Sequence, residues 1–323
     1  MGGRIMKYVK LSLIAVLATF NFGIASADVI GIGVTKGGSV NRMGTAIAKV
    51  VSSHSGSQMR PVVRASTQQL VPEVNSGKLK FAMGNMMQIN MALAGTGMSK
   101  GIKYENLRMV GTMIPFRWGI AVRNDSSIKK MTDLKGKRIP HGHDAGPLFH
   151  FLYVGVLASA GLTYDDVERI PVVLFKEGWN KFKQGKADVA LTGVGSGIME
   201  DMNATVPSGV RFLPFDGSPA PKKLLFDHTA SNLVDVDPGK GLAGVITTTK
   251  LAVYDYTLYA SKMTPNGDVY KVVKALYEHG EELKEVGGVF RRGFSPKNMS
   301  KDQKIAYHPG AVKFYKEAGS WNR

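Results

Sequence analysis

Polar and glycine residues gather where predicted strands end, and their types suit the binding of an anion. The turn Gly37-Gly38-Ser39 follows an apolar strand and opens a helix that carries Asn41 and Arg42. Glycines let the backbone approach a ligand, and the free N–H groups and dipole of a helix N-terminus favour negative charge. An arginine adds a bidentate grip on a carboxylate. A tight turn that needs glycine conformations explains the two glycines equally well.

Two further turns at strand ends carry residues of similar kinds. They are Ser66, Thr67 and Gln68 after the second predicted strand, and Asn85, Met86 and Met87 after the third. The side chains of Ser66, Thr67 and Gln68 could donate hydrogen bonds to a ligand, or they could cap the helix that follows. Methionines in such a position suit an adaptable apolar wall, although core packing explains them as well.

The most unusual stretch is HGHDAGPLFH, residues 141–150. Its histidines and Asp144 are of types that bind metals, but no paired motif elsewhere completes a site, so we expect no metal and no cofactor. A pocket wall is the better interpretation, with His143 and Asp144 as polar groups and Phe149 as an apolar surface. Neighbouring segments add Phe116, Arg117, Trp118 and Trp179. Such a wall suits a ligand more aromatic than most amino acids; the alternative is that Phe149 and His150 are helix core.

The motifs of the common enzyme classes are incomplete. Gly195 and Ser196 lie in GVGSGIMED, where Ile198 stands in place of the second glycine of a nucleophile elbow. Asp227 and His228 are adjacent in the chain, which is a poor arrangement for a catalytic triad. Phosphate-loop and dinucleotide fingerprints are absent from the sequence. We therefore predict that the protein is not an enzyme and keep Gly195 and Ser196 as ligand contacts; an exported hydrolase is the enzyme alternative.

The elements that must position these residues alternate between strand and helix, which predicts mostly parallel sheets covered by helices. Two segments, NSGKLKFAMGN at 75–85 and KQGKADVALTG at 183–193, repeat one unit. Each has a polar helix end, a Gly-Lys pair, an apolar strand and a small polar residue at the end of that strand. This repeat predicts two α/β lobes, each with its own mixed sheet flanked by helices.

The stretch LRMVGTMIPFRWGIAVRND, residues 107–125, reads as a long extended segment suited to crossing between the lobes. A proline-rich stretch at 218–222 suggests the point where the chain returns to the first lobe. We therefore predict a discontinuous lobe I, residues 28–117 and 218–323, and a lobe II, residues 118–217. Ligands of open α/β sheets bind beyond the carboxyl ends of the strands, so facing strand ends predict a hinged cleft.

Composition limits the class of protein further. The 323 residues exceed the usual range of one domain. The absence of cysteine excludes a disulfide scaffold and thiolate metal sites. The net charge of +17 could serve nucleic-acid binding, but the lysines are scattered over amphipathic helices without a basic block. We predict no nucleic-acid partner; the charge would attract anionic ligands or an acidic membrane partner.

Residues 1–27 have the pattern of a signal peptide. Arg4, Lys7 and Lys10 precede the apolar run LSLIAVLATF, and the small residues Ala25-Ser26-Ala27 form a cleavage site. The run is too short to span a bilayer. We predict cleavage after Ala27, a mature chain with a net charge of +14, and a periplasmic location. The alternative is a hydrophobic first helix of the fold.

The chain resembles the TAXI family of solute-binding proteins, which serve tripartite (TRAP) secondary transporters. The resemblance covers Asp28 to Arg323 and rests on NSGKLKFAM, MTDLKGKRI, SAGLTYDDV and, most specifically, the ending HPGAVKFYKEAGSW. It implies a type II periplasmic binding-protein fold without catalysis and a monomer. It also implies delivery of a small organic acid, such as glutamate, to a membrane permease after closure of the lobes.

The sequence departs from this family at the ligand contacts. Val40 and Asn41 stand in place of paired tyrosines and Arg42 in place of a proline, while HGHDAGPLFH replaces a Gly-Ser-Gly turn. Specificity for glutamate therefore does not transfer, and Arg42 is preferred over Arg64 and Arg117 as the residue that grips the ligand. A receptor that docks a signalling protein instead of a permease remains an alternative.

Overall fold

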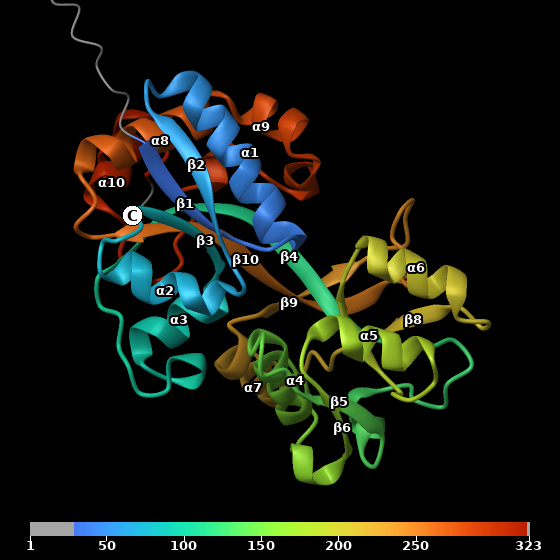
Figure 1. Ribbon diagram of the computed structural model, residues 1–323. Coiled ribbons are helices and arrows are strands. Elements are labelled where there is room, and N and C mark those ends of the chain that lie inside the picture. The colour runs from blue at the N-terminus through green and yellow to red at the C-terminus, as the bar shows by residue number, and fades with distance from the viewer. Residues whose placement is uncertain (1–28, 322–323) are drawn as a thin grey trace, which may run out of the picture.

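Two long antiparallel strands, β4 (Leu107–Arg123) and β10 (Thr249–Ser261), run through both halves of the molecule (Figure 1). The computed structural model describes residues 29–321, so the expected signal peptide lies outside the described residues. The strands pair from Leu107 opposite Ser261 to Trp118 opposite Ala252. They join the strands of the two lobes into one eight-stranded mixed sheet.

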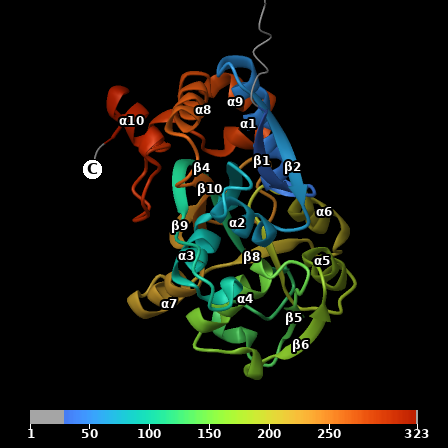
Figure 2. The same cartoon turned by 60° about the vertical axis from the view of Figure 1, so that its left-hand side comes forward.

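The first lobe has the strand order β2-β1-β3-β10-β4. Its parallel strands are β1 (Val29–Thr35), β2 (Gln58–Arg64) and β3 (Phe81–Asn85), and the connecting helices are α1 (Gly38–His54) and α2 (Thr67–Asn75). The two connections cross the sheet in opposite directions, so right-handed crossovers place α1 and α2 on opposite faces. Helix α3 (Met86–Ala94) lies near α2, whereas α8 (Asn266–Glu278), α9 (Gly280–Val286) and α10 (Pro309–Glu317) lie on the side of α1 (Figures 1 and 2).

The second lobe extends the same sheet and adds a small one. Strands β7 (Ala190–Gly193) and β8 (Val210–Leu213) pair with β4, and β9 (Asn232–Val236) pairs with β10. A separate parallel pair consists of β5 (Arg138–Gly142) and β6 (Glu168–Val172). The helices are α4 (Leu148–Ser159), α5 (Phe175–Lys183), α6 (Gly197–Thr205) and α7 (Pro219–Thr229), and α7 packs against α4.

The repeated sequence unit folds in the same way in both lobes. In each copy a helix ends, a glycine takes the left-handed conformation (Gly77 at φ 76°, Gly185 at φ 73°), and a strand follows. The prediction of a two-lobed α/β fold with a mixed sheet flanked by helices is confirmed. The two lobes share the large sheet through β4 and β10, however, because both strands are long enough to pair on either side of the crossing.

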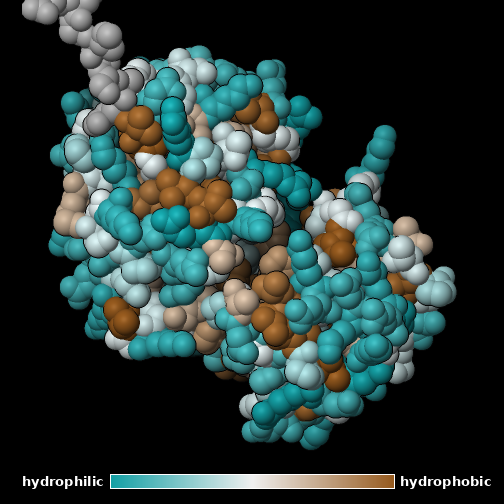
Figure 3. Space-filling view, viewed as in Figure 1, coloured by the Kyte–Doolittle hydropathy of each residue, from teal (hydrophilic) through white to brown (hydrophobic). Residues whose placement is uncertain are grey.

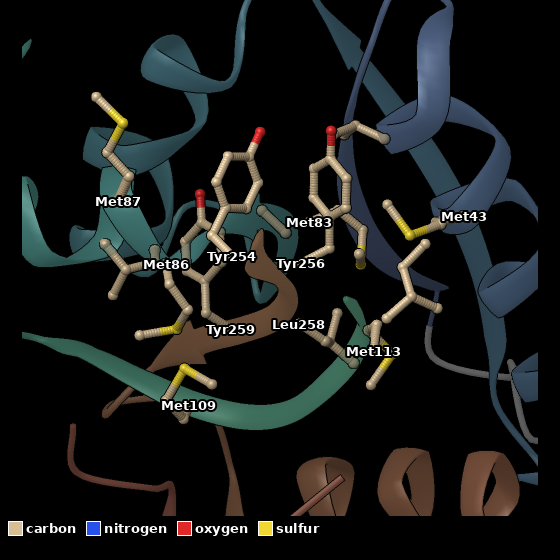
Figure 4. Packing of buried hydrophobic residues seen from close by; sticks show 14 of the residues in the cluster. Met43, Met83, Met86, Met87, Met109, Met113, Tyr254, Tyr256, Leu258 and Tyr259 are labelled. Carbon is tan, nitrogen blue, oxygen red and sulfur yellow. The ribbon is translucent and has the colours of Figure 1, made fainter. Parts of the chain in front are cut away.

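Methionines and tyrosines pack around the crossing strands in the first lobe (Figure 4). Met83, Met109, Met113 and Leu258 are buried there. Unbranched thioether side chains fill irregular gaps beside rigid rings. Tyr254 and Tyr256 project from β10 away from the C-terminal helices.

None of the helices within residues 29–321 combines the length and the apolar character needed to cross a membrane.

Candidate functional site

The molecular surface is hollowed between the two lobes (Figure 3), and the crossing strands that join the lobes carry an aromatic cluster. Phe116 on β4 is opposite Tyr254 on β10, and its ring centroid lies 5.3 Å from that of Tyr254 and 5.2 Å from that of Tyr256. Tyr256 is paired with Asn85 at the end of β3, in the first lobe. Gly193 ends β7 in the second lobe, where a Cβ atom would lie 2.7 Å from the Phe116 ring. The cluster therefore connects the strand ends of the two lobes, and we call the space above it the cleft.

The first wall of the cleft begins at the N-terminus of α1. Gly37 and Gly38 have φ values of 86° and 76°, a region that favours glycine, and open space lies beside both. The Asn41 side chain donates to the Thr35 carbonyl oxygen at 2.8 Å and so fixes this turn. Arg42, in the first turns of the helix, is exposed.

The other two strand ends of the first lobe hold their own helices in place. Asn85 caps α3, because its side-chain oxygen accepts from the Gln88 backbone N–H at 2.9 Å. The Gln68 amide donates to the Met98 carbonyl oxygen and accepts from the Gln88 side chain. Met86 and Met87 are core residues, 3% and 1% exposed.

This arrangement leaves three hydroxyl groups on the first wall. The side chains of Ser39, Ser66 and Thr67 are partly exposed and make no hydrogen bond within the described part of the chain. Arg64, by contrast, makes a two-pronged ion pair with Glu73 on α2, with N–O distances of 2.8 and 2.9 Å. Its guanidinium lowers the pKa of Glu73 and is engaged within the lobe. Arg64 therefore holds α2 against β2.

The second wall begins with the loop after β5. His143 has φ 61°, an uncommon value for a residue with a side chain, and its ring is 1% exposed. The backbone is held by hydrogen bonds from His143 N to Val172 O and from Gly146 N to His143 O, both 2.8 Å. The ring lies 5.8 Å from both Phe149 and Tyr153. Burial lowers the pKa of His143 to about 4, so the ring is neutral at pH 7.

Both ring nitrogens of His143 are buried and lack a hydrogen-bond partner among residues 29–321. A neutral imidazole carries one donor and one acceptor, and buried polar groups of this kind are usually satisfied. Asp144, next in the chain, is exposed. The other two histidines of the loop pack on Tyr164, His141 edge-on at 4.6 Å and His150 stacked at 5.5 Å. Burial also lowers their pKa values.

Three partly exposed aromatic rings continue this wall. Phe149 stacks on Phe175 with centroids 4.9 Å apart, and Phe175 meets Trp179 at 4.9 Å. The indole of Trp179 donates to the Leu191 carbonyl oxygen at 2.8 Å, which fixes its orientation. Phe175 was missed in the sequence, although it directly follows Leu174, the cap residue of α5, at a strand-end turn.

The last strand end, after β7, is tied to the first lobe. Ser196 caps α6 by accepting from Met199 N, and its hydroxyl lies 3.0 Å from that of Thr192. The Gly195 carbonyl oxygen accepts a 2.8 Å hydrogen bond from the guanidinium of Arg292, a residue that follows α9. We call this contact the Arg292–Gly195 bridge.

Two sequence candidates on β4 are not exposed at the cleft. Trp118 lies on the same face of β4 as Phe116, with its ring 6.5 Å from that of Tyr254, but it is 0% exposed and donates to the Ser231 hydroxyl at 3.2 Å, so we assign it to the core beneath the cluster. Arg117 points to the opposite side of the strand from Phe116 and lines a cavity of about 450 Å³. This hinge pocket is bounded by Met86, Pro115, Asn232, Asp255 and Lys301 among others.

Residues 33–319 match the NMT1-like family. This match spans most of the chain. The chain belongs to the NMT1-like family. Membership of the TAXI family, which the sequence motifs suggest, stays a prediction.

Solved structures share the fold of this NMT1-like protein at low sequence identity. PhnD1 from Prochlorococcus marinus in complex with methylphosphonate is 10% identical with a TM-score of 0.58, covering 91% of this chain and 99% of that one. A TctC solute-binding protein from Polaromonas is 16% identical with a TM-score of 0.54, covering 92% and 96%. XAC2383 from Xanthomonas citri bound to ATP is 12% identical with a TM-score of 0.55, covering 91% and 97%. These similarities establish the fold of the NMT1-like chain.

Proposed function

We propose that this NMT1-like protein is an extracytoplasmic solute-binding receptor of a TAXI-type TRAP transporter. It binds a small organic anion in the cleft as a monomer and delivers it to the membrane permease. The observation that carries the proposal is the aromatic cluster of Phe116, Tyr254 and Tyr256, which connects the end of β3 to the end of β7. Helix N-termini from both lobes thereby face one space across two crossing strands.

The charge of the ligand follows from the groups around the cleft. The helix that starts at Gly38 and the exposed Arg42 both favour a negative group on the first wall. Hydroxyl groups of Ser39, Ser66 and Thr67 supply further donors. Methylphosphonate and ATP, the ligands named for two proteins of similar fold, are both anions, which supports this choice.

The opposite wall supports an aromatic or otherwise apolar body for the ligand. Phe149, Phe175 and Trp179 present partly exposed ring surfaces, and aromatic pairs add specific geometry to the burial of apolar area. His143 offers unsatisfied ring nitrogens behind this wall. We therefore propose an aromatic carboxylate, with its carboxylate toward α1 and its ring toward α4 and α5.

We also propose export with cleavage after Ala27, and a division of the mature chain into two lobes. The first crossing near residue 117 is retained from the sequence. The sequence predicted that the chain passes back from lobe II to lobe I near Ser218. Helix α7 packs on α4, however, and β9 pairs with the first half of β10. We therefore place this second crossing within β10, near Asp255.

The test is a binding titration with the untagged mature protein, residues 28–323, against benzoate, phenylacetate, glutamate and succinate. An aromatic acid should raise the melting temperature by mass action. In Arg42→Ala the affinity for that acid should fall by about tenfold or more, since a charge-assisted contact is lost. The melting temperature without ligand should stay nearly unchanged because the side chain is exposed.

The matched control is Lys49→Ala, an exposed cation on the same helix that lies further from the cleft. Equal affinity in Arg42→Ala and the wild type would remove Arg42 from the site. If no acid of the set stabilises the protein, the proposed ligand class is wrong.

A further inference from the structure

We propose that the junction of α1, α8 and α9 binds a transition-metal ion, with Zn²⁺ as the best match. Three side chains meet there: His54, the last residue of α1; His279, between α8 and α9; and Glu282, in the first turn of α9. Their ligand atoms all lie within 4.8 Å of one another. We call these residues the His–Glu cluster.

The contacts inside the cluster are already close. His54 Nε2 lies 2.6 Å from a carboxylate oxygen of Glu282, and the His54 and His279 rings stack with centroids 3.5 Å apart and planes 10° apart. The two imidazoles and the carboxylate thus already lie within reach of a single ion.

The backbone around the cluster is fixed while the three side chains keep room to move. Helix α1 packs on α8 and α9 through residues such as Ile47, Val51 and Leu283, all fully buried. The side chains of His54 and Glu282 are 28% and 34% exposed. The rings can therefore turn out of the stack, which in-plane coordination by both nitrogens requires.

Three helix ends meet at the cluster. His54 ends α1 and His279 caps the C-terminus of α8, so the carbonyl ends of two helices favour a cation there, against the single N-terminus of the short helix α9. The neighbouring acids Glu278 on α8 and Glu281 on α9 are each neutralised by a lysine. Lys274 and Lys284 pair with Glu278 and Glu281, which leaves Glu282 to the histidines.

The ligand types select the metal. Two imidazole nitrogens and one carboxylate oxygen form a set that Zn²⁺ accepts at about 2.0–2.2 Å in tetrahedral geometry, with water in the remaining position. Ligand atoms of such a site are about 3.3 Å apart, so shifts of about 1.5 Å or less complete it. Ca²⁺ and Mg²⁺ prefer all-oxygen sites and should bind poorly.

Because the cluster joins the end of α1 to the α8–α9 junction, a bound ion would clamp the first lobe. The cluster lies at the opposite end of α1 from Gly38 and Arg42. Metal binding should therefore stabilise the protein without contributing a ligand contact in the cleft. This inference does not depend on the proposed transport function.

The test is calorimetric titration of chelator-treated, untagged mature protein with ZnCl₂, beside CaCl₂ and MgCl₂. We expect one Zn²⁺ site and a melting temperature that rises with Zn²⁺. His279→Ala and Glu282→Gln should each weaken binding by about tenfold or more, since each removes a ligand atom. Glu281→Gln, which removes an acid of the same helical turn, should bind Zn²⁺ like the wild type.

The variants are interpretable because the mutated side chains are partly exposed, and the metal-free melting temperature of each one checks its fold. Absence of Zn²⁺ binding in the wild type overturns the proposal. So does binding that survives in both His279→Ala and Glu282→Gln but is lost in His150→Ala, which would place the metal in the loop after β5.

Discussion

At the scale of single residues, His143 combines a left-handed backbone with a buried, unsatisfied ring. Such conformations persist only where the surroundings hold them, and they concentrate at functional sites. The hydrogen bonds to Val172 and from Gly146 fix the backbone of His143, while Phe149 and Tyr153 enclose its ring. Protonation of the His143 ring is therefore coupled to unfolding of the loop that carries it.

The pH dependence of stability should report this burial. In the unfolded chain a histidine binds its proton near pH 6.5, whereas in the folded protein burial lowers the pKa of His143 to about 4. As the pH falls from about 6.5 to about 4, the unfolded state takes up a proton that the folded state does not, so the protein loses stability. The loss is on the order of 3 kcal/mol at pH 4.

Thermal unfolding from pH 7.5 down to about 4 measures this loss. His143→Phe keeps an aromatic ring at this position and should flatten the pH dependence. Part of the dependence should remain, because burial also lowers the pKa values of His141 and His150. His228→Phe, at the end of α7, serves as the control. If His143→Phe and the wild type lose stability in parallel, His143 does not control the effect.

The sequence indicated where polar residues cluster, but it could not indicate which groups their side chains hydrogen-bond to. Asn41, Gln68 and Asn85 were predicted as ligand contacts, and each makes a hydrogen bond within its own lobe; their contact with a ligand stays a prediction. Capping was the stated alternative for the second turn, but no side chain caps α2 there, and of these three residues only Asn85 caps a helix. Residue type alone cannot separate ligand binding from internal bonding, because both use the same amide groups. Trp118 shares a face of β4 with Phe116 but is fully buried beside Tyr254 and Phe215, and residue type alone could not show that burial.

At the scale of elements, the Arg292–Gly195 bridge connects a segment of the first lobe to the turn before α6. Arg292 is exposed, so the hydrogen bond contributes about 1 kcal/mol or less, equivalent to a factor of about five in the ratio of closed to open molecules. We expect Arg292→Ala to favour the open form. Small-angle scattering without ligand should give a larger radius of gyration for this variant.

The adjacent exposed residue gives the control, since Arg291→Ala removes the same charge and leaves the bridge in place. A radius of gyration that is equal in Arg292→Ala, Arg291→Ala and the wild type would show that the bridge does not restrain the lobes.

Helix α7 shows why some elements escape prediction from sequence. The proline-rich stretch at 218–222 was read as a connection, but Pro219 and Pro221 lie in the first turn of a helix, where a missing N–H costs little. A local proline pattern does not show whether a segment forms a helix or a connection, because here the packing of α7 on α4 decides the outcome.

At the scale of the whole molecule, the repeated unit and the long extended stretch were enough to predict two lobes joined by crossing strands. The return crossing was harder to locate, because β10 serves both lobes within one uninterrupted strand. The hinge pocket lies at this crossing. Its walls come from α3 and from β9, so bending at the crossing must change its shape.

Ligand-induced closure can be measured directly because the chain has no cysteine. A spin-label pair at Lys78→Cys and Lys186→Cys, exposed sites in the first and second lobes, reports the distance between them. A ligand shifts the population only as far as it binds the closed state more tightly than the open one. We therefore expect a saturating aromatic acid to shorten this distance, while a pair at Lys49→Cys and Lys78→Cys within the first lobe stays constant. If the acid binds and the distance between lobes does not change, recognition by a permease would have to depend on the ligand or its wall rather than on closure.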